Sequence, residues 1–433
     1  MSTKKRLALD LTPLRRHRDF RLLYSAMTVT SIGSFITYVT IPYQVTKMTG
    51  DPLLVGLIGI CELVPLLFMA FVGGALADYV DRRVLVFGGE VAQLALTGLL
   101  LVNALLGEPH LWLLYVIAGL AAAVDGLQRP ALEGLTPRLV EPGEIPAASA
   151  LTSLRHQVAS LGAPTIAGLL IAAFGTGRGL GWVYAIDVAT FAASLTLLAL
   201  MKAVPPPEMA DRPSLRSVAT GLRYAVRRPE LLGTYLVDIN AMAFGMPQAL
   251  YPFFADKLGG PAVLGLLYAA PSAGSMLATL TSGWTQRIHR HGLAVIVAAG
   301  LWGVGIVVFG FSHALWIALF GLIVAGAADM ISGVFRSTIW NQTIPDHLRG
   351  RLAGIEMLSY SIGPLLGGVR SGGMAKIVGV GGSVVWGGAL CIAGTIALAA
   401  ALPKFVAYDG RDGLARKAVE EAERAALVAS STG

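Results

Sequence analysis

Long apolar runs recur along nearly the whole chain and limit what it can fold into. Each run is about 20 to 26 residues long, the length that an α-helix rising about 1.5 Å per residue needs to cross a hydrocarbon core of about 30 Å. Of the 433 residues, 55% are hydrophobic and 14% are charged, and the mean hydropathy is +0.67. Soluble domains carry roughly 25% charged residues. A water-soluble fold cannot bury this much apolar surface, so the sequence predicts an integral membrane protein.

We place twelve membrane-spanning helices in these runs, which makes the predicted fold class an all-α membrane protein. The predicted spans are 20–46, 53–77, 84–106, 111–135, 146–174, 180–201, 230–255, 262–284, 292–312, 314–338, 350–378 and 380–402. With this count, 25 of the 33 lysines and arginines fall on one face together with both termini. Basic residues gather in cytoplasmic loops. The sequence therefore predicts a multi-pass protein of the inner (plasma) membrane with both termini in the cytoplasm.

The predicted spans divide into two sets of six. We predict an N-terminal six-helix half (1–201), a cytoplasmic linker (202–229), a C-terminal six-helix half (230–402) and a cytoplasmic tail (403–433). Similar segments occur in both halves, since Asp125, Arg129 and Pro137 of the fourth span have counterparts in the tenth, namely Asp329, Arg336 and Pro345. Two related halves predict a substrate site near the bilayer midplane between them, around which the molecule alternates its access.

Composition also excludes several classes of function. The net charge of +7 follows from the basic cytoplasmic loops, so it indicates no nucleic-acid partner. Cys61 and Cys391 both lie in apolar spans, which favours packing over a disulfide or a metal. The sequence contains no Walker A motif, no HExxH and no CxxC. We therefore expect a monomer in the lipid bilayer that binds a small-molecule substrate, with no cofactor and no metal, and uses a proton gradient for energy.

The segment GGALADYVDRR, at 73–83 between the second and third spans, is the most specific motif. It resembles the signature loop of the major facilitator superfamily, in which a glycine is followed four residues later by an aspartate, and then by an acidic residue or a glycine and two basic residues. The matching residues here are Gly74, Asp78, Asp81, Arg82 and Arg83. The resemblance implies the major facilitator fold, with twelve helices in two pseudo-symmetric halves.

Other segments resemble one branch of that superfamily, the twelve-span drug and siderophore exporters, which include macrolide efflux proteins and enterobactin exporters. They are LRRHRDFRLLYSAMTVTSIGSF, TGDPLLVGLIG, RPALEGLTPRLV and IPDHLRGRLAG. Together they cover nearly the whole chain. One departure concerns the first span, where Gly33 is followed by Ser34 and the acidic residue that branch members often carry is missing.

The resemblance implies a conformational latch in the loop between the second and third spans. Asp78 and Arg82, with Glu133 at the inner end of the fourth span, would stabilise the outward-facing state of the transport cycle. A carboxylate near a helix N-terminus gains about 0.3–1 kcal/mol, so such a latch can be broken. The alternative is a solvated turn whose arginines only set the orientation.

Ionisable residues inside the predicted spans each need a partner, water or a function, because a charge at a helix centre costs at least about 2.5–3.5 kcal/mol. Asp125, Arg129 and Glu133 recur every four residues and so share one helix face. The candidates for carrying a coupling proton are Glu62, Asp125, Asp238 and Asp329, and those for intramembrane pairing are Arg129, Arg155 and Arg336. Ion pairs that only hold helices together are the alternative. Asp187 and His156 are further polar residues within spans.

The first span is rich in hydroxyl groups, and aromatic residues recur in both halves. A large, partly aromatic site with few fixed charges suits amphipathic molecules. We select as candidate substrate-binding residues Ser34, Phe35, Tyr38, Tyr235, Asn240, Phe244, Tyr251 and Trp340. Hydroxyls that bond to their own helix backbone, and aromatic residues that contact lipid, are the alternatives.

These observations lead to one functional prediction and three alternatives. We predict a proton-coupled exporter, an antiporter of amphipathic small molecules such as drugs, which would confer multidrug resistance. An exporter of one specific metabolite or siderophore is the alternative within transport. From other classes, a membrane-embedded lipid-modifying enzyme would need His156, which has no accompanying nucleophile, and a non-transporting receptor would show no proton flux.

Overall fold

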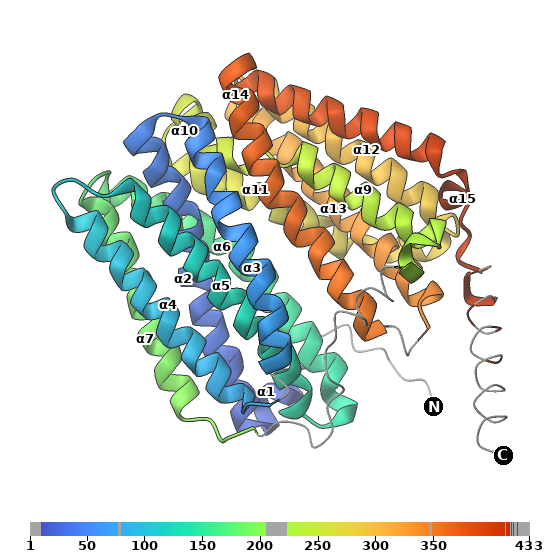
Figure 1. The fold of residues 1–433 in the computed structure, drawn as a ribbon, viewed down its shortest axis with the longest axis horizontal. Coiled ribbons are helices and arrows are strands. Elements are labelled where there is room, and N and C mark those ends of the chain that lie inside the picture. Colours follow the sequence, from blue (N-terminus) through green and yellow to red (C-terminus); the bar gives the residue numbers. More distant parts are fainter. Residues whose placement is uncertain are drawn as a thin grey trace. The chain divides into compact units, whose positions relative to one another are not determined.

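The computed structural model describes residues 10–76, 79–204, 223–345, 349–411, 413–415, 417, 419 and 422, and in these ranges every regular element is a helix (Figure 1). Contacts divide the chain into two compact units. Unit 1 comprises Met1–Leu54, Ile60–Pro213 and Pro252–Ala269, and unit 2 comprises Val55–Gly59, Ser214–Tyr251 and Ala270–Gly433.

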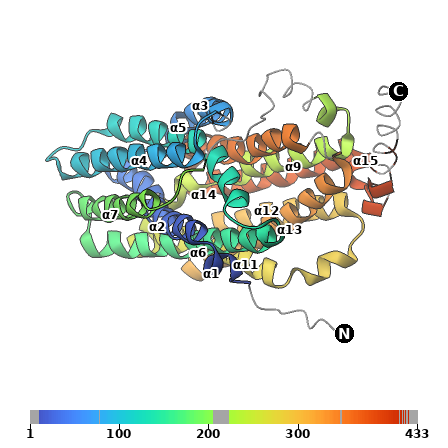
Figure 2. The same ribbon diagram turned by 90° about the horizontal axis from the view of Figure 1, so that it is seen from below.

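Unit 1 contains the helices that correspond to the first six predicted spans. They are α2 (Arg18–Thr49), most of α3 (Pro52–Leu76), α4 (Arg82–Leu105), α5 (Leu111–Leu135), α6 (Ile145–Phe174) and α7 (Gly179–Ala199), preceded by the short α1 (Thr12–Arg16). Two 3₁₀ turns, η1 (Thr136–Arg138) and η2 (Pro142–Glu144), join α5 to α6. Helix α7 packs against both α2 and α4, α4 also against α5, and α2 also against α6 (Figure 2).

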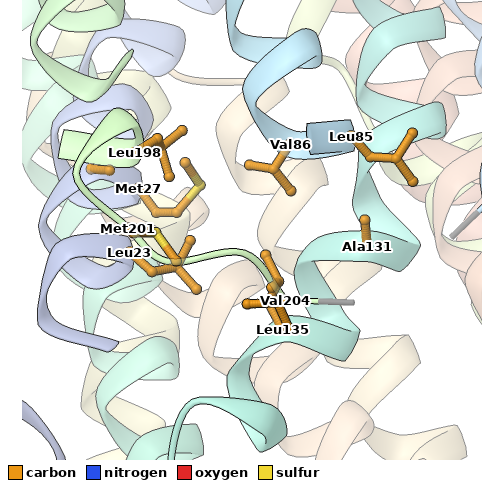
Figure 3. Packing of buried hydrophobic residues seen from close by; sticks show 10 residues of the cluster. Leu23, Met27, Leu85, Val86, Ala131, Leu135, Leu198, Met201 and Val204 are labelled. Carbon is orange, nitrogen blue, oxygen red and sulfur yellow. The ribbon is translucent and has the colours of Figure 1, made fainter. Parts of the chain in front are cut away.

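One apolar cluster holds α2, α4, α5 and α7 together at one end of these helices. Figure 3 shows its side chains pointing toward one another from the four helices and from the segment after α7. Its buried members are Leu23, Ala26, Met27, Leu85, Val86, Ala131, Leu135, Leu198, Met201 and Val204. Close-packed apolar side chains resist rearrangement. The cluster therefore fixes the start of α4, where the signature loop ends, against the C-terminal end of α7.

Unit 2 contains α9 (Pro229–Gly245), α12 (His291–Gly310), α13 (Leu315–Thr343), α14 (Arg349–Ala401), α15 (Pro403–Val406) and most of α11 (Pro261–Leu280). The shorter elements are η3 (Gln248–Leu250), α10 (Tyr251–Leu258), which from its second residue on belongs to unit 1, and η4 (Ser282–Arg287). Helix α12 packs against α13, α14 and α9, and α14 packs against α9.

The predicted seventh span, 230–255, is interrupted. Helix α9 ends at Gly245, Met246 takes an extended conformation with φ −106° and ψ 99°, and η3 and α10 follow. Met246 precedes Pro247, and the ring of a proline disfavours the helical conformation in the residue before it. The proline therefore explains why the apolar run does not form one continuous helix.

The predicted eleventh and twelfth spans lie in one assigned element, α14, which bends at Gly379 with φ 77° and ψ 166°. Glycine adopts this conformation without steric cost. Across the bend, Arg370 Nη1 donates to the Ser383 carbonyl at 3.2 Å and Ser383 Oγ donates to the Ser371 carbonyl at 2.7 Å. In Figure 1, α14 consists of an orange arm and a red arm that run in different directions.

The helices agree with the predicted fold class. Among the described residues, ten helices are long and apolar enough to cross a membrane. In this count the two arms of α14 are one helix. Taking α14 as two spans and α9 with α10 as one more gives the twelve that the sequence predicts. Most of the predicted linker, 205–222, lies outside the described residues.

Candidate functional site

The basic residues of the signature loop bind the ends of neighbouring helices in unit 1. Arg82 Nη1 donates to the Gly134 carbonyl at 2.7 Å, and Arg83 donates to the carbonyls of Leu198 at 3.1 Å and Ala199 at 2.7 Å. The last carbonyls of a helix have no partner within it and attract cations. Arg82 therefore joins the start of α4 to the C-terminal end of α5, and Arg83 joins it to the C-terminal end of α7.

The acidic residue Asp81 caps helix α4. Its Oδ1 accepts from the Arg83 backbone amide at 2.8 Å, and its Oδ2 accepts from the Val204 amide at 3.1 Å. Gly74, near the end of α3, has open space where a Cβ would stand. Asp78, the predicted centre of the latch, lies outside the described residues, so the latch stays a prediction.

The polar face of α5 carries the three predicted residues of the fourth span. Arg129 Nε lies 3.4 Å from Glu133 Oε1, and both side chains are substantially exposed. Asp125, one turn earlier, accepts at 3.0 Å from Gln93 Nε2 of α4, which also donates to the Ala121 carbonyl. Glu133 is thus engaged with its own helix, and Asp125 with its neighbour.

Glu62 and Asp125 lie within electrostatic range of each other on α3 and α5. The two helices approach closely, because a Cβ at Gly119 would stand 2.8 Å from the Cys61 carbonyl oxygen, and one at Gly126 would stand 2.5 Å from that of Leu66. Among the described residues, Glu62 makes no hydrogen bond or ion pair. The structure therefore brings together two of the four predicted proton carriers.

The other two predicted carriers meet at one arginine in unit 2. Arg336 of α13 pairs through Nη1 with Asp238 of α9, and its Nη2 lies 3.7 Å from Asp329. The side chains of Arg336 and Asp238 are 10% and 3% exposed, so this ion pair is buried. The partner of Asp238 comes from another helix, which inspection of its own span does not reveal. Arg155, the remaining predicted arginine, donates to Ser31 Oγ at 3.1 Å.

The aromatic candidates of unit 1 form a group around α2. Tyr38 contacts Phe35 edge-on with ring centroids 6.4 Å apart, and Tyr268 of α11 at 5.8 Å. Phe35 in turn lies 5.8 Å from the ring of His156 on α6. Tyr38 and the neighbouring Ser34 are exposed in the structure. Tyr268 was not among the predicted residues, because it is isolated in an apolar run.

The candidates of unit 2 do not form a single group. Tyr235 and Trp340 stack with ring centroids 5.7 Å apart, and Trp340 Nε1 donates to Thr234 Oγ1 at 2.9 Å. Tyr251 is buried against Phe309.

Two further candidates of this unit contact α14. Asn240 Nδ2 donates to the Cys391 carbonyl at 2.9 Å, and the carbonyl of Phe244 would lie 2.5 Å from a Cβ at Gly387. That these candidate residues bind the substrate stays a prediction.

Sequence inspection missed Glu90, which is the single acidic residue of α4 and is 1% exposed. It interrupts the apolar run VLVFGGEVAQLAL as a single acidic residue, and that interruption was the available signal. Within the described part of the chain, no group of three or more histidines, cysteines or acidic residues is placed to hold a metal ion.

Comparison with known proteins supports the same family. The sequence model of one protein family, the transmembrane secretion effectors of the major facilitator superfamily, matches residues 8–433. The enterobactin exporter EntS of Shigella boydii serotype 4 is 30% identical over 378 residues, which cover 87% of this chain and 89% of the relative. The same exporter of Escherichia coli O81 is 29% identical over the same length.

Solved structures share the fold at low sequence identity. A bacterial homologue of the human lysosomal transporter Spinster superposes with a TM-score of 0.69 at 14% identity, covering 93% of this chain and 98% of that one. A mutant of the nucleoside transporter NupG gives a TM-score of 0.71 at 12% identity, covering 89% and 99%. The chain therefore belongs to the transmembrane secretion effector family of the major facilitator superfamily and is a membrane transporter.

Proposed function

We propose that the protein is a proton-coupled exporter of amphipathic small molecules that works by alternating access, with both termini in the cytoplasm. The observation that carries export is the similarity to enterobactin exporters over 87% of the chain. The distribution of lysine and arginine supports the orientation. The aromatic group around Tyr38, whose own side chain is exposed, supports an amphipathic substrate.

Proton coupling is supported by Glu62 and Asp125. Two carboxylates within electrostatic range repel each other when both are ionised, so a proton shared by the pair relieves the repulsion. Gln93 donates to Asp125, which leaves Glu62 as the member with no bonded partner among the described residues. The pair is therefore suited to take up one proton and to lose it when a substrate binds.

A catecholate siderophore is a second candidate substrate, favoured by the relatives named as enterobactin exporters. Reconstituted vesicles distinguish it from a general amphipathic substrate when enterobactin and the organic cation ethidium are tested in parallel. Accumulation of ethidium alone supports a drug exporter, accumulation of enterobactin alone supports the siderophore, and accumulation of both supports a broad specificity.

The first prediction concerns the Glu62 and Asp125 pair. Vesicles that are more acidic inside by about one pH unit should concentrate a transported probe about tenfold for each exchanged proton, because one unit corresponds to ~1.36 kcal/mol. Glu62→Gln and Asp125→Asn should each abolish this accumulation and leave exchange between labelled and unlabelled probe in place. Both quantities are measured by probe uptake with the membrane potential clamped at zero.

Glu108→Gln is the matched control, because Glu108 is an exposed acidic residue in the loop between α4 and α5. It should accumulate the probe as the wild type does. Normal accumulation in both Glu62→Gln and Asp125→Asn would remove the pair from the mechanism. A wild-type protein that moves neither probe would contradict the proposed export.

A further inference from the structure

Glu90 lies in the first half of α4, and its carboxylate is enclosed by α2, α4 and α7 of unit 1. Oε2 accepts from Thr30 Oγ1 of α2 at 2.6 Å and from Ser194 Oγ of α7 at 2.8 Å. Oε1 is also buried, and it has no hydrogen-bond partner among the described residues. The two oxygens of one carboxylate therefore have opposite surroundings, one bonded twice and the other enclosed without a bond.

No cation in the described part of the chain pairs with this carboxylate. Among the described residues Glu90 makes no ion pair, and both of its partners are neutral hydroxyls. A buried polar atom left without a hydrogen bond costs about 1–3 kcal/mol, and a charged one costs more. A proton on Glu90 removes the charge from the enclosed Oε1. The geometry of this conformation thus favours a protonated side chain.

The neighbouring ionisable groups increase this preference. On α7, Asp187 is buried and accepts from Thr37 of α2 and from Thr190 Oγ1 at 3.0 Å. On α5, Asp125 accepts from Gln93, which lies three residues after Glu90 on α4. These two groups are acidic and within electrostatic range of Glu90.

Four basic residues of α4, α5 and α6 are engaged elsewhere. Arg129 of α5 lies 3.4 Å from Glu133, and Arg155 of α6 donates to Ser31 at 3.1 Å. Arg82 and Arg83, at the start of α4, bind the carbonyls at the ends of α5 and α7. Among the described residues, the groups that bond to Glu90 are the hydroxyls of Thr30 and Ser194, and the charged groups that interact with it electrostatically are Asp125 and Asp187.

The position of α2 against α7 determines whether an ionised Glu90 can be stabilised. The helices touch closely at Gly33, where an added Cβ would stand 2.1 Å from both Asp187 Oδ1 and Thr190 Oγ1. Thr30 and Thr37 lie on either side of this contact, and each donates to one of the two acids. Because Thr30 and Ser194 come from different helices, a shift of α2 relative to α7 would open the enclosure of the carboxylate, and water could then bond to the buried Oε1.

We propose that Glu90 carries a proton in the transport cycle: it holds the proton while α2, α4 and α7 pack as in this structure, and releases it to water when the packing opens. In the release step the carboxyl O–H bond breaks, its electron pair stays on the glutamate, and water takes the proton. The carboxylate regains a proton from water before the helices close again. This role rests on the proposed export function and adds a third acidic residue to the coupling machinery.

The test uses the full-length protein in vesicles with ethidium and enterobactin as probes. Glu90→Gln keeps a buried polar side chain that cannot ionise, so exchange of labelled for unlabelled probe should stay near the wild-type rate. Accumulation of the probe driven by a gradient of about one pH unit should fall from about tenfold to none. Thr97→Val is the matched control, because Thr97 is a buried polar residue on the same helix whose hydroxyl does not ionise, and this variant should accumulate probe normally.

Two further measurements separate a proton carrier from a residue that only supports packing. Infrared difference spectra recorded across a pH step should show a carboxylic acid C=O band that disappears in Glu90→Gln. Ser194→Ala removes one donor to the carboxylate and makes it harder to form, so the pH profile of transport should move to higher pH. Glu90→Asp should restore accumulation at least in part if Glu90→Gln fails to fold.

Each outcome decides the proposal. Normal pH-driven accumulation in Glu90→Gln, or an infrared band that the substitution leaves unchanged, overturns the role of Glu90 while the exporter function stands. Loss of both accumulation and exchange in Glu90→Gln, without rescue by Glu90→Asp, shows a purely structural residue. A wild type that accumulates neither probe removes the exporter function, and the transport role of Glu90 falls with it.

Discussion

Replacing Arg336 by leucine is expected to lower the free energy of unfolding by about 3–5 kcal/mol, because removing one partner of a buried ion pair leaves the other charge without compensation. Asp238 is 3% exposed and Arg336 is 10% exposed, so water cannot replace the lost cation. Asp329, 3.7 Å from Arg336, would lose the same cation. Unfolding in detergent with increasing denaturant measures the change.

Two control variants identify the cause. The double variant Asp238→Asn with Arg336→Leu removes both charges and should recover most of the stability, since a buried ion pair replaced by neutral groups is often nearly neutral in energy. Arg411→Leu disrupts an exposed pair with Asp409, at 2.7 Å, and should leave the unfolding transition almost unchanged. An Arg336→Leu protein as stable as Arg411→Leu would contradict the buried-pair explanation.

The same variants bear on the predicted proton carriers of unit 2. If Asp238 serves only to neutralise Arg336, the double variant should be stable and should still accumulate substrate under a pH gradient. If Asp238 releases a proton during transport, the double variant should fold and exchange probe but lose accumulation. Stability and coupling are thus measured independently on one protein.

Helix positions were predictable because they depend on local sequence. Length and hydropathy predict a span wherever about 20 apolar residues follow one another, and α2 through α7 lie where these runs do. The interruption after Gly245 depends on Met246 and Pro247, a local signal that the hydropathy of the run hides. The bend of α14 similarly depends on the conformation of one glycine, Gly379.

The partners of buried charges were not predictable in the same way, because they come from distant parts of the chain. Glu90 accepts from residues 60 and 104 positions away, and no periodicity along one helix reports such a contact. Asp238 and Arg336 were each recognised as buried ionisable residues, but their pairing depends on how α9 packs near α13. Sequence patterns indicate which faces are polar, and packing decides which polar groups meet.

The start of the predicted C-terminal tail is part of unit 2. Phe405 of α15 is fully buried in a cluster with Val237, Val295, Ala299, Phe335 and Ile339. Glycines make room for it, because a Cβ at Gly233 would stand 2.3 Å from its ring and one at Gly292 would stand 1.7 Å from its carbonyl oxygen. The segment continues along the same unit, where the Gly410 amide donates to the His289 carbonyl at 3.1 Å and Tyr408 Oη donates to Gln342 at 3.3 Å.

Phe405→Ala is therefore expected to lower the free energy of unfolding by about 3–5 kcal/mol, the usual loss when a buried phenylalanine is cut to alanine and a cavity remains. Phe311→Ala is the matched control in the same unit, because Phe311 is 63% exposed and its removal leaves no cavity. Phe405→Leu keeps most of the volume and should lose much less. Equal unfolding transitions for Phe405→Ala and Phe311→Ala would contradict this expectation. They would show that the packing of α15 against α9 and α12 adds nothing to the free energy of unfolding.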